Sequence, residues 1–207
     1  MVAKRKIPSW LFATTVVASL ATVIGPLIVF GVSERGLQLA ARYTVRVSFP
    51  LFLLAYLTGP FVALWRTNLT RWLQKHRRYI GLSFAIAHTI HLGALTGYFV
   101  FIGVSPDAAT LIGGGLAYAL MFAMAATSND WSVKKLGANW RRLHSIGLHY
   151  LWFIFLITYM GRLSGGEGGD TTEDLVVVGI VGSSLVFGAL LIRLIGILKR
   201  RRRAAAA

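Results

Sequence analysis

The chain has 207 residues, of which 56% are hydrophobic and only 14% are charged, and its mean hydropathy is +0.64. This composition excludes an ordinary water-soluble domain. The formal charge is +15, but the basic residues stand in short runs between long apolar stretches, so they indicate membrane topology and not nucleic-acid binding. Without cysteine there can be no disulfide, no iron-sulfur cluster and no thioether-linked heme, so any heme must be held non-covalently.

Six stretches are long enough to cross a hydrocarbon core, which takes about 20 apolar residues in a helix. The first begins like a signal peptide, but it is too long and lacks a clear cleavage site, so we interpret it as a retained helix. No loop is long enough for a separate soluble domain. We therefore predict one all-α domain over residues 1–207, a six-helix bundle of a multi-pass membrane protein, with spans at about 10–32, 47–65, 79–101, 109–127, 143–161 and 175–198.

The charges of successive loops predict the orientation. One side receives four basic clusters: Lys4, Arg5 and Lys6; Arg66, Arg71, Lys75, Arg77 and Arg78; Lys134, Lys135, Arg141 and Arg142; and Lys199 with Arg200 to Arg203. The other side receives only Arg35, Arg42, Arg46 and Arg162, together with Glu34, Asp107, Glu167, Asp170, Glu173 and Asp174. Because basic loops stay inside, both termini are predicted to be cytoplasmic.

Three smaller features accompany these spans. Gly113, Gly114 and Gly115 open the fourth span with no preceding strand, which favours close helix packing over nucleotide binding. The Gly-rich acidic segment 164–174 is interpreted as an external connection. Arg193 lies inside the last span, where it either snorkels to the interface or pairs with a cofactor carboxylate.

The third and fifth spans contain four of the five histidines, and ionisable side chains within a membrane usually have a function. His88 and His91 are three residues apart, so they share one face of a helix. His144 and His149 are five apart and point about 140° away from each other. The fifth histidine, His76, lies in a basic loop and is interpreted as solvated.

Depth along the helices limits which histidines can pair. His88 and His91 lie about 15 and 20 Å beyond Arg78, whereas His144 and His149 lie about 3 and 10 Å beyond the corresponding Arg142. His88 or His91 can therefore face His149 across one iron atom. His91 and His144 differ in depth by roughly 16 Å, which is too far for one iron, although each could serve a different site. Neutral imidazole is a common axial ligand of heme iron, and a helical bundle can hold the macrocycle. The alternative is that these histidines hydrogen-bond between helices.

Heme would also need partners for its propionates. Arg77, Arg78, Arg141 and Arg142 end the same two spans on the cytoplasmic side, although orientation by the positive-inside rule is sufficient to explain them. The outer arginines oppose the charge bias and are better candidates to anchor propionates, a quinone or a partner protein: Arg42, Arg46 and Arg162. Trp152 packs either against a neighbouring helix or against a cofactor.

Two segments resemble the ferric reductase-like transmembrane domain family, and within it the MsrQ or YedZ type of heme-binding membrane subunit. The first is Arg77-Arg78-Tyr79-Ile80-Gly81-Leu82 followed by His91-Leu92, and the second is Thr127-Ser128 followed by Lys135-Leu136-Gly137 and Trp140-Arg141-Arg142-Leu143-His144. Length and span number also agree. The resemblance implies a cytochrome b-type subunit with one or two b hemes, and some members are associated with FMN, for which no binding motif is visible here.

Carried over by position, His91 and His144 match the family's heme-associated histidines. The family's further histidine of the fifth helix is replaced by Ile157. His149-Tyr150-Leu151-Trp152 resembles the segment around that missing histidine, but at a position eight residues earlier. We interpret the chain as a divergent branch in which His149, alone or with His88, takes the role of that ligand.

The resemblance implies electron transfer across the membrane from a cytoplasmic flavin reductase or quinol donor to a periplasmic acceptor such as a methionine-sulfoxide reductase. The chain has no flavin or nicotinamide domain, so it is an electron-transfer subunit and not a complete reductase. Two alternatives remain: a heme-free assembly subunit, and a small proton-coupled transporter with histidine relays. No inverted repeat, broken helix or carboxylate within the spans supports the transporter.

Overall fold

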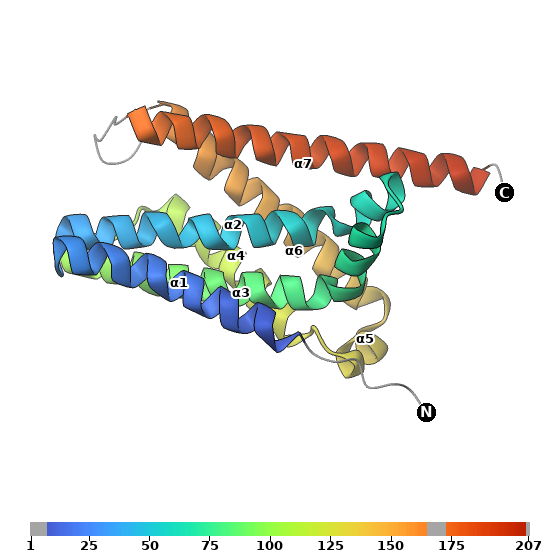
Figure 1. Ribbon diagram of the computed structural model, residues 1–207, viewed down its shortest axis with the longest axis horizontal. Helices are drawn as coiled ribbons and strands as arrows, with labels where there is room; N and C mark the ends of the chain where they lie inside the picture. The colour runs from blue at the N-terminus through green and yellow to red at the C-terminus, as the bar shows by residue number, and fades with distance from the viewer. Residues whose placement is uncertain (1–7, 165–172, 206–207) are drawn as a thin grey trace. The chain divides into compact units, whose positions relative to one another are not determined.

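The computed structural model describes residues 8–164 and 173–205 (Figure 1). The basic run Lys4 to Lys6, the acids Glu167 and Asp170, and most of the Gly-rich external connection lie outside the described residues. The described chain is helical and contains no strand, which confirms the all-α prediction. Its elements are α1 (Ser9–Phe30), α2 (Glu34–Leu64), α3 (Asn68–Ile102), α4 (Ala108–Ala126), α5 (Asp130–Leu136), α6 (Ala138–Gly161), a 3₁₀ turn η1 (Arg162–Ser164) and α7 (Glu173–Ala205).

Six of these helices, all except α5, are long and apolar enough to cross a membrane, as predicted. Each overlaps one predicted span, but α2 and α3 begin 13 and 11 residues earlier than the hydropathy indicated (34 against 47, and 68 against 79). Hydropathy detects the apolar part of a helix, whereas hydrogen bonding continues through the polar turns before it. Span orientation and the single-domain assignment stay predictions.

Local capping explains where the longer helices begin. The Ser33 hydroxyl accepts a hydrogen bond from the backbone N–H of Gly36 at 3.2 Å and so caps the first turn of α2. The Thr67 hydroxyl accepts from the N–H of Thr70 at 3.2 Å at the start of α3. Ser33 and Thr67 are typical N-cap residues, but hydropathy does not detect them.

Helix α5 was not predicted, because its seven residues are too few for a span. Asn129 caps it by accepting from the N–H of Ser132 at 2.8 Å. Gly137 then adopts φ +50°, a conformation that glycine takes without steric cost, and α6 begins at the next residue. The basic loop before the fifth span is therefore a short capped helix.

The chain divides into two compact units, and the boundaries fall inside α2 and α3. The first unit comprises 1–55 and 75–108, that is, α1 with most of α2 and α3, which run side by side in Figure 1. The second comprises 56–74 and 109–207, with α4 to α7 and the adjoining ends of α2 and α3. In the first unit Phe52 and Phe84 form a buried aromatic contact, with ring centroids 5.5 Å apart.

Glycines bring the helices of the second unit into close contact. A Cβ added at Gly147 of α6 would come within 2.7 Å of the Met124 sulfur on α4, and one at Gly182 of α7 would overlap the Tyr159 ring on α6. Gly113 faces Ile154, as predicted, but Gly114 and Gly115 have no neighbouring atom within 4 Å of an added Cβ. Small residues at helix contacts are the usual means of close packing in membrane proteins.

Candidate functional site

Two hydroxyl–histidine contacts connect α2 to α3 in the first unit. The Thr44 hydroxyl lies 2.9 Å from Nδ1 of His91, and the Ser48 hydroxyl lies 3.0 Å from Nδ1 of His88. Thr44 and Ser48 are one turn apart on α2, and the two histidines are one turn apart on α3, running in the opposite direction. The prediction that His88 and His91 share a face is confirmed by their ring centroids, 5.1 Å apart.

The hydroxyl groups determine which ring nitrogen holds the proton. Thr44 Oγ1 lies 3.0 and 2.9 Å from the carbonyl oxygens of Ala40 and Ala41, and Ser48 Oγ lies 3.3 Å from that of Val45. A hydroxyl has one proton, and if it donates that proton to its own helix it accepts from the histidine. Both imidazoles then carry the proton on Nδ1 and the lone pair on Nε2, which is the tautomer that ligates metals.

The two histidines differ in accessibility. His88 is 9% exposed and stacks on Phe84, with centroids 5.1 Å apart and an interplanar angle of 28°. His91 is half-buried. A macrocycle needs an open approach to the ligating nitrogen, so His91 is the better placed of the two.

The ring of His149 on α6, in the second unit, also has its Nδ1 close to an oxygen atom, as the rings of His88 and His91 do. Its Nδ1 lies 2.7 Å from the carbonyl oxygen of Ser145, one turn earlier, and a carbonyl can only accept. The proton is therefore on Nδ1 and the lone pair on Nε2. The ring is exposed, and its edge meets the ring of Tyr56 with centroids 5.8 Å apart.

His144 lies in a different environment. Its ring stacks on Trp140 with centroids 3.9 Å apart, its Nδ1 lies 3.1 Å from the Trp140 carbonyl oxygen, and its Nε2 lies 3.5 Å from the Ser128 hydroxyl. Trp140 in turn donates its indole N–H to the carbonyl of Thr127 at 2.9 Å. The structure thus brings together the two halves of the second motif, and both nitrogens of His144 have contacts within it.

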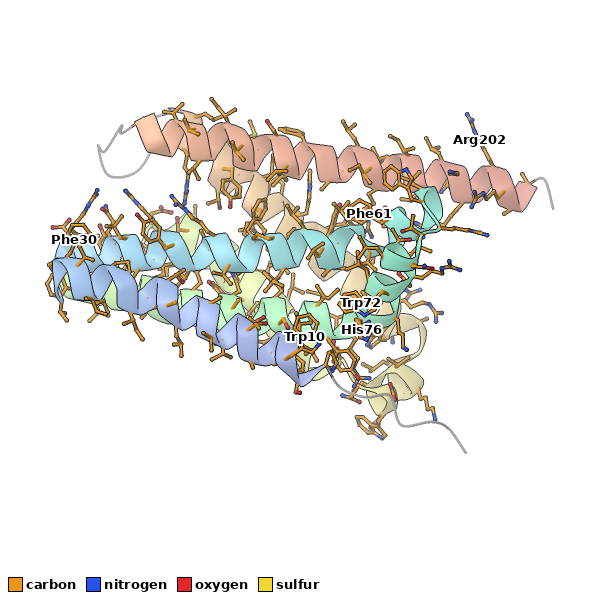
Figure 2. The ribbon with its side chains drawn as sticks, in the orientation of Figure 1. Trp10, Phe30, Phe61, Trp72, His76 and Arg202 are labelled. Carbon is orange, nitrogen blue, oxygen red and sulfur yellow. The ribbon has the colours of Figure 1, made fainter. Side chains whose placement is uncertain are left out.

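The remaining histidine, His76, is half-buried on α3, and its ring centroid is 6.4 Å from that of Tyr79. Figure 2 shows it at the same end of the first unit as Trp10. It lies in a continuous helix and not in the predicted loop, because α3 begins at Asn68.

Only some of the arginines proposed from sequence lie at helix ends. Arg77 and Arg78, predicted at the cytoplasmic end of the third span, lie inside α3, because that helix already begins at Asn68. On α6, Arg141 and Arg142 are exposed in the first turns, and Arg142 contacts Asn139 at 3.5 Å. On α3, Arg77 is half-buried and Arg78 is exposed. The outer arginines contact aromatic rings instead: the Arg46 guanidinium lies 4.7 Å from the Tyr43 ring centroid, and that of Arg162 lies 5.6 Å from the Tyr159 ring centroid.

Trp152 is fixed between helices. Its indole N–H donates to the Val186 carbonyl of α7 at 2.9 Å. This contact supports the helix-packing interpretation.

Three residues that contact candidate histidines were not singled out from sequence: Thr44 and Ser48 in the first unit and Tyr56 in the second. A signal existed for the first two, because hydroxyl residues four apart on an apolar helix can serve histidines three apart on a neighbour. Among the described residues, no three His, Asp or Glu side chains converge on a common point. A macrocycle that brings its own four nitrogen donors would need only one imidazole on each face.

Two curated relatives from Yersinia resemble this chain over most of its length. Both are named protein-methionine-sulfoxide reductase heme-binding subunit MsrQ. The protein of Yersinia pseudotuberculosis serotype O:1b is 27% identical over 166 residues, covering 72% of this chain and 78% of its own, and that of Yersinia pestis strain Pestoides F is 27% identical over 72% and 77%. The chain is therefore similar to MsrQ subunits over most of its length, at low identity. This confirms the likeness inferred from the two motifs.

No protein-family profile matches the chain, and no solved structure matches it. The MsrQ likeness and the six long apolar helices together make it a multi-pass membrane protein.

Proposed function

We propose that this protein is a membrane electron-transfer subunit that holds b-type heme non-covalently through His91 and His149. The observation that carries the proposal is the geometry that these two rings share: each Nδ1 lies within hydrogen-bond distance of an oxygen, 2.9 Å for His91 and 2.7 Å for His149. This geometry favours a proton on Nδ1 and leaves the lone pair on Nε2. A metal-ligating histidine typically donates its second ring N–H to a carbonyl or other acceptor, which fixes the ring and increases its basicity. The relatives named as heme-binding support the same cofactor.

Heme would supply a one-electron iron couple, and the chain's own residues would set its orientation and surroundings. His91 is supported by Thr44 of α2, and His149 by the carbonyl of Ser145. His88 is the additional ligand if a second heme is bound, and His144 is the additional ligand that the family resemblance implies. Arg77, Arg78, Arg141 and Arg142 are the proposed partners of propionates on the cytoplasmic side.

The direction of transfer follows from the predicted orientation. The donor would be a cytoplasmic flavin reductase or a quinol, and the acceptor would be a periplasmic protein such as a methionine-sulfoxide reductase. The relatives' name supports this class of acceptor. A bacterial inner-membrane location is proposed from the family resemblance. FMN is proposed from family resemblance alone.

The test is an absorption spectrum of the purified full chain in detergent, first oxidised and then reduced with dithionite, with a pyridine hemochrome assay for heme per chain. We expect the sharp reduced α band of a six-coordinate bis-histidine b heme. A featureless spectrum after expression with ample heme would refute the proposal. It would favour a heme-free assembly subunit or a proton-coupled transporter instead.

Replacing Thr44 with valine should weaken heme binding about 10- to 100-fold, the usual cost of removing a second-shell partner of a metal ligand. Valine keeps the shape of threonine but cannot accept from Nδ1 of His91. The measurement is heme retention during titration with apomyoglobin as a competing acceptor. The matched control is Thr89→Val on α3, whose hydroxyl donates to the Ala85 carbonyl of its own helix at 2.7 Å. Equal retention in both variants would mean that Thr44 does not support a ligand.

A further inference from the structure

Arg193 has an unusual position for a charged side chain, inside the apolar part of helix α7 and six residues before the basic run that begins at Lys199. Its Nη1 donates to the backbone carbonyl of Tyr56 at 3.0 Å, and its guanidinium carbon lies 4.5 Å from the Tyr56 ring centroid. Its Nε is buried and has no hydrogen-bond partner among the described residues. The guanidinium is therefore held beside Tyr56. A side chain that only extended to the membrane interface would not need this contact.

The sequence explains why the Tyr56 carbonyl needs a donor. In a helix this oxygen would accept from the N–H four residues later, but that residue is Pro60, which has no N–H. A carbonyl left without its helical partner in an apolar environment is costly unless another group donates to it. Gly196 allows the donor to approach, because a Cβ there would come within 3.0 Å of the Pro60 Cα.

Tyr56 connects this cation to the candidate heme ligand. The same aromatic ring that lies under the guanidinium meets the edge of the His149 ring, with centroids 5.8 Å apart and planes at 78°. Tyr56 is 1% exposed, so water does not separate the charge from the imidazole on this side. A charge acts more strongly on its neighbours in such a low-dielectric environment than it would in water.

We propose that Arg193 is a fixed intramembrane cation that raises the reduction potential of heme held at His149. The inference rests on the proposed function. Taking up one electron from the quinol or flavin donor converts ferric to ferrous iron and lowers the charge of the cofactor by one. A nearby positive charge therefore favours the reduced state.

The simpler explanation is that Arg193 serves only as a hydrogen-bond donor to the carbonyl that Pro60 leaves free. Glutamine separates the two roles, because it can still donate a hydrogen bond but has no charge. Lysine keeps the charge. Lys199 provides a matched control: its Nζ donates to the Leu64 carbonyl at 3.0 Å, so it bonds the same two helices in the same way, two turns further from Tyr56.

The experiment is a potentiometric titration of the heme α band in the purified full chain and in Arg193→Gln, Arg193→Lys and Lys199→Gln. We expect a lower midpoint potential in Arg193→Gln only, with values close to wild type in the other two. An unchanged potential in Arg193→Gln, or an equal shift in Lys199→Gln, would overturn the proposal.

Heme occupancy decides the case in which Arg193→Gln binds too little heme to titrate. Retained heme at the wild-type potential in Arg193→Lys would support a role for the charge. Loss of heme from both variants would overturn it in favour of a structural role of the guanidinium itself, because lysine keeps the charge and both replacements can donate a hydrogen bond. A wild-type protein without heme would refute the proposed function itself. A wild-type protein with heme and no shift in Arg193→Gln would refute only this inference.

Discussion

His91→Ala and His149→Ala are each expected to lose most of the bound heme. Alanine removes the Nε2 lone pair and leaves the supporting acceptors in place, so the fold keeps its helices while the iron loses an axial ligand. The measurement is heme per chain by pyridine hemochrome on protein purified in parallel with the wild type. In a partly loaded variant, the reduced spectrum should change from six-coordinate to five-coordinate.

The control for this pair is His76→Ala. His76 is also half-buried on α3, where its ring centroid lies 6.4 Å from that of Tyr79, and it is not one of the proposed ligands. We expect this variant to keep nearly all its heme. Full heme in both His91→Ala and His149→Ala would refute the ligand assignment while leaving the cytochrome class intact.

The histidine face of α3 could be predicted because it depends only on local geometry. Residues three apart in a helix share a face, whatever the helix packs against, so His88 and His91 were correctly placed together. Their partners could not be predicted in the same way. Which hydroxyls meet which rings depends on the register of α2 against α3, and that register is set by long-range packing such as the contact of Phe52 with Phe84.

The helix ends show the same division between local and long-range information. Hydropathy located the six apolar segments but not the polar turns of α2 that precede the second one, where Ser33 acts as the N-cap. The missing hydrogen-bond donor for the Tyr56 carbonyl could have been predicted from the sequence, since Pro60 has no backbone N–H. The donor that replaces this N–H could not be predicted. Arg193 is 133 positions from Pro60, and the two residues approach each other only through tertiary packing.

Gly182→Leu should disrupt the packing of α6 on α7. An added Cβ would overlap the Tyr159 ring, and Tyr159 is itself buried at 4% exposure, so neither helix can yield without a backbone shift. Overpacking of this kind costs about 1–3 kcal/mol or more. The expected result is a lower apparent melting temperature and a smaller monodisperse fraction in fluorescence-detected size-exclusion chromatography.

Gly188→Leu on the same helix is the matched control, because an added Cβ there has no atom within 4 Å. Leucine is also a better helix former than glycine, so this variant should be at least as stable as the wild type. Loss of α6–α7 packing would also weaken the bond from Trp152 to the Val186 carbonyl and so affect the helix that carries His149. Equal melting temperatures for the two variants would mean that the close approach at Gly182 does not hold these helices together.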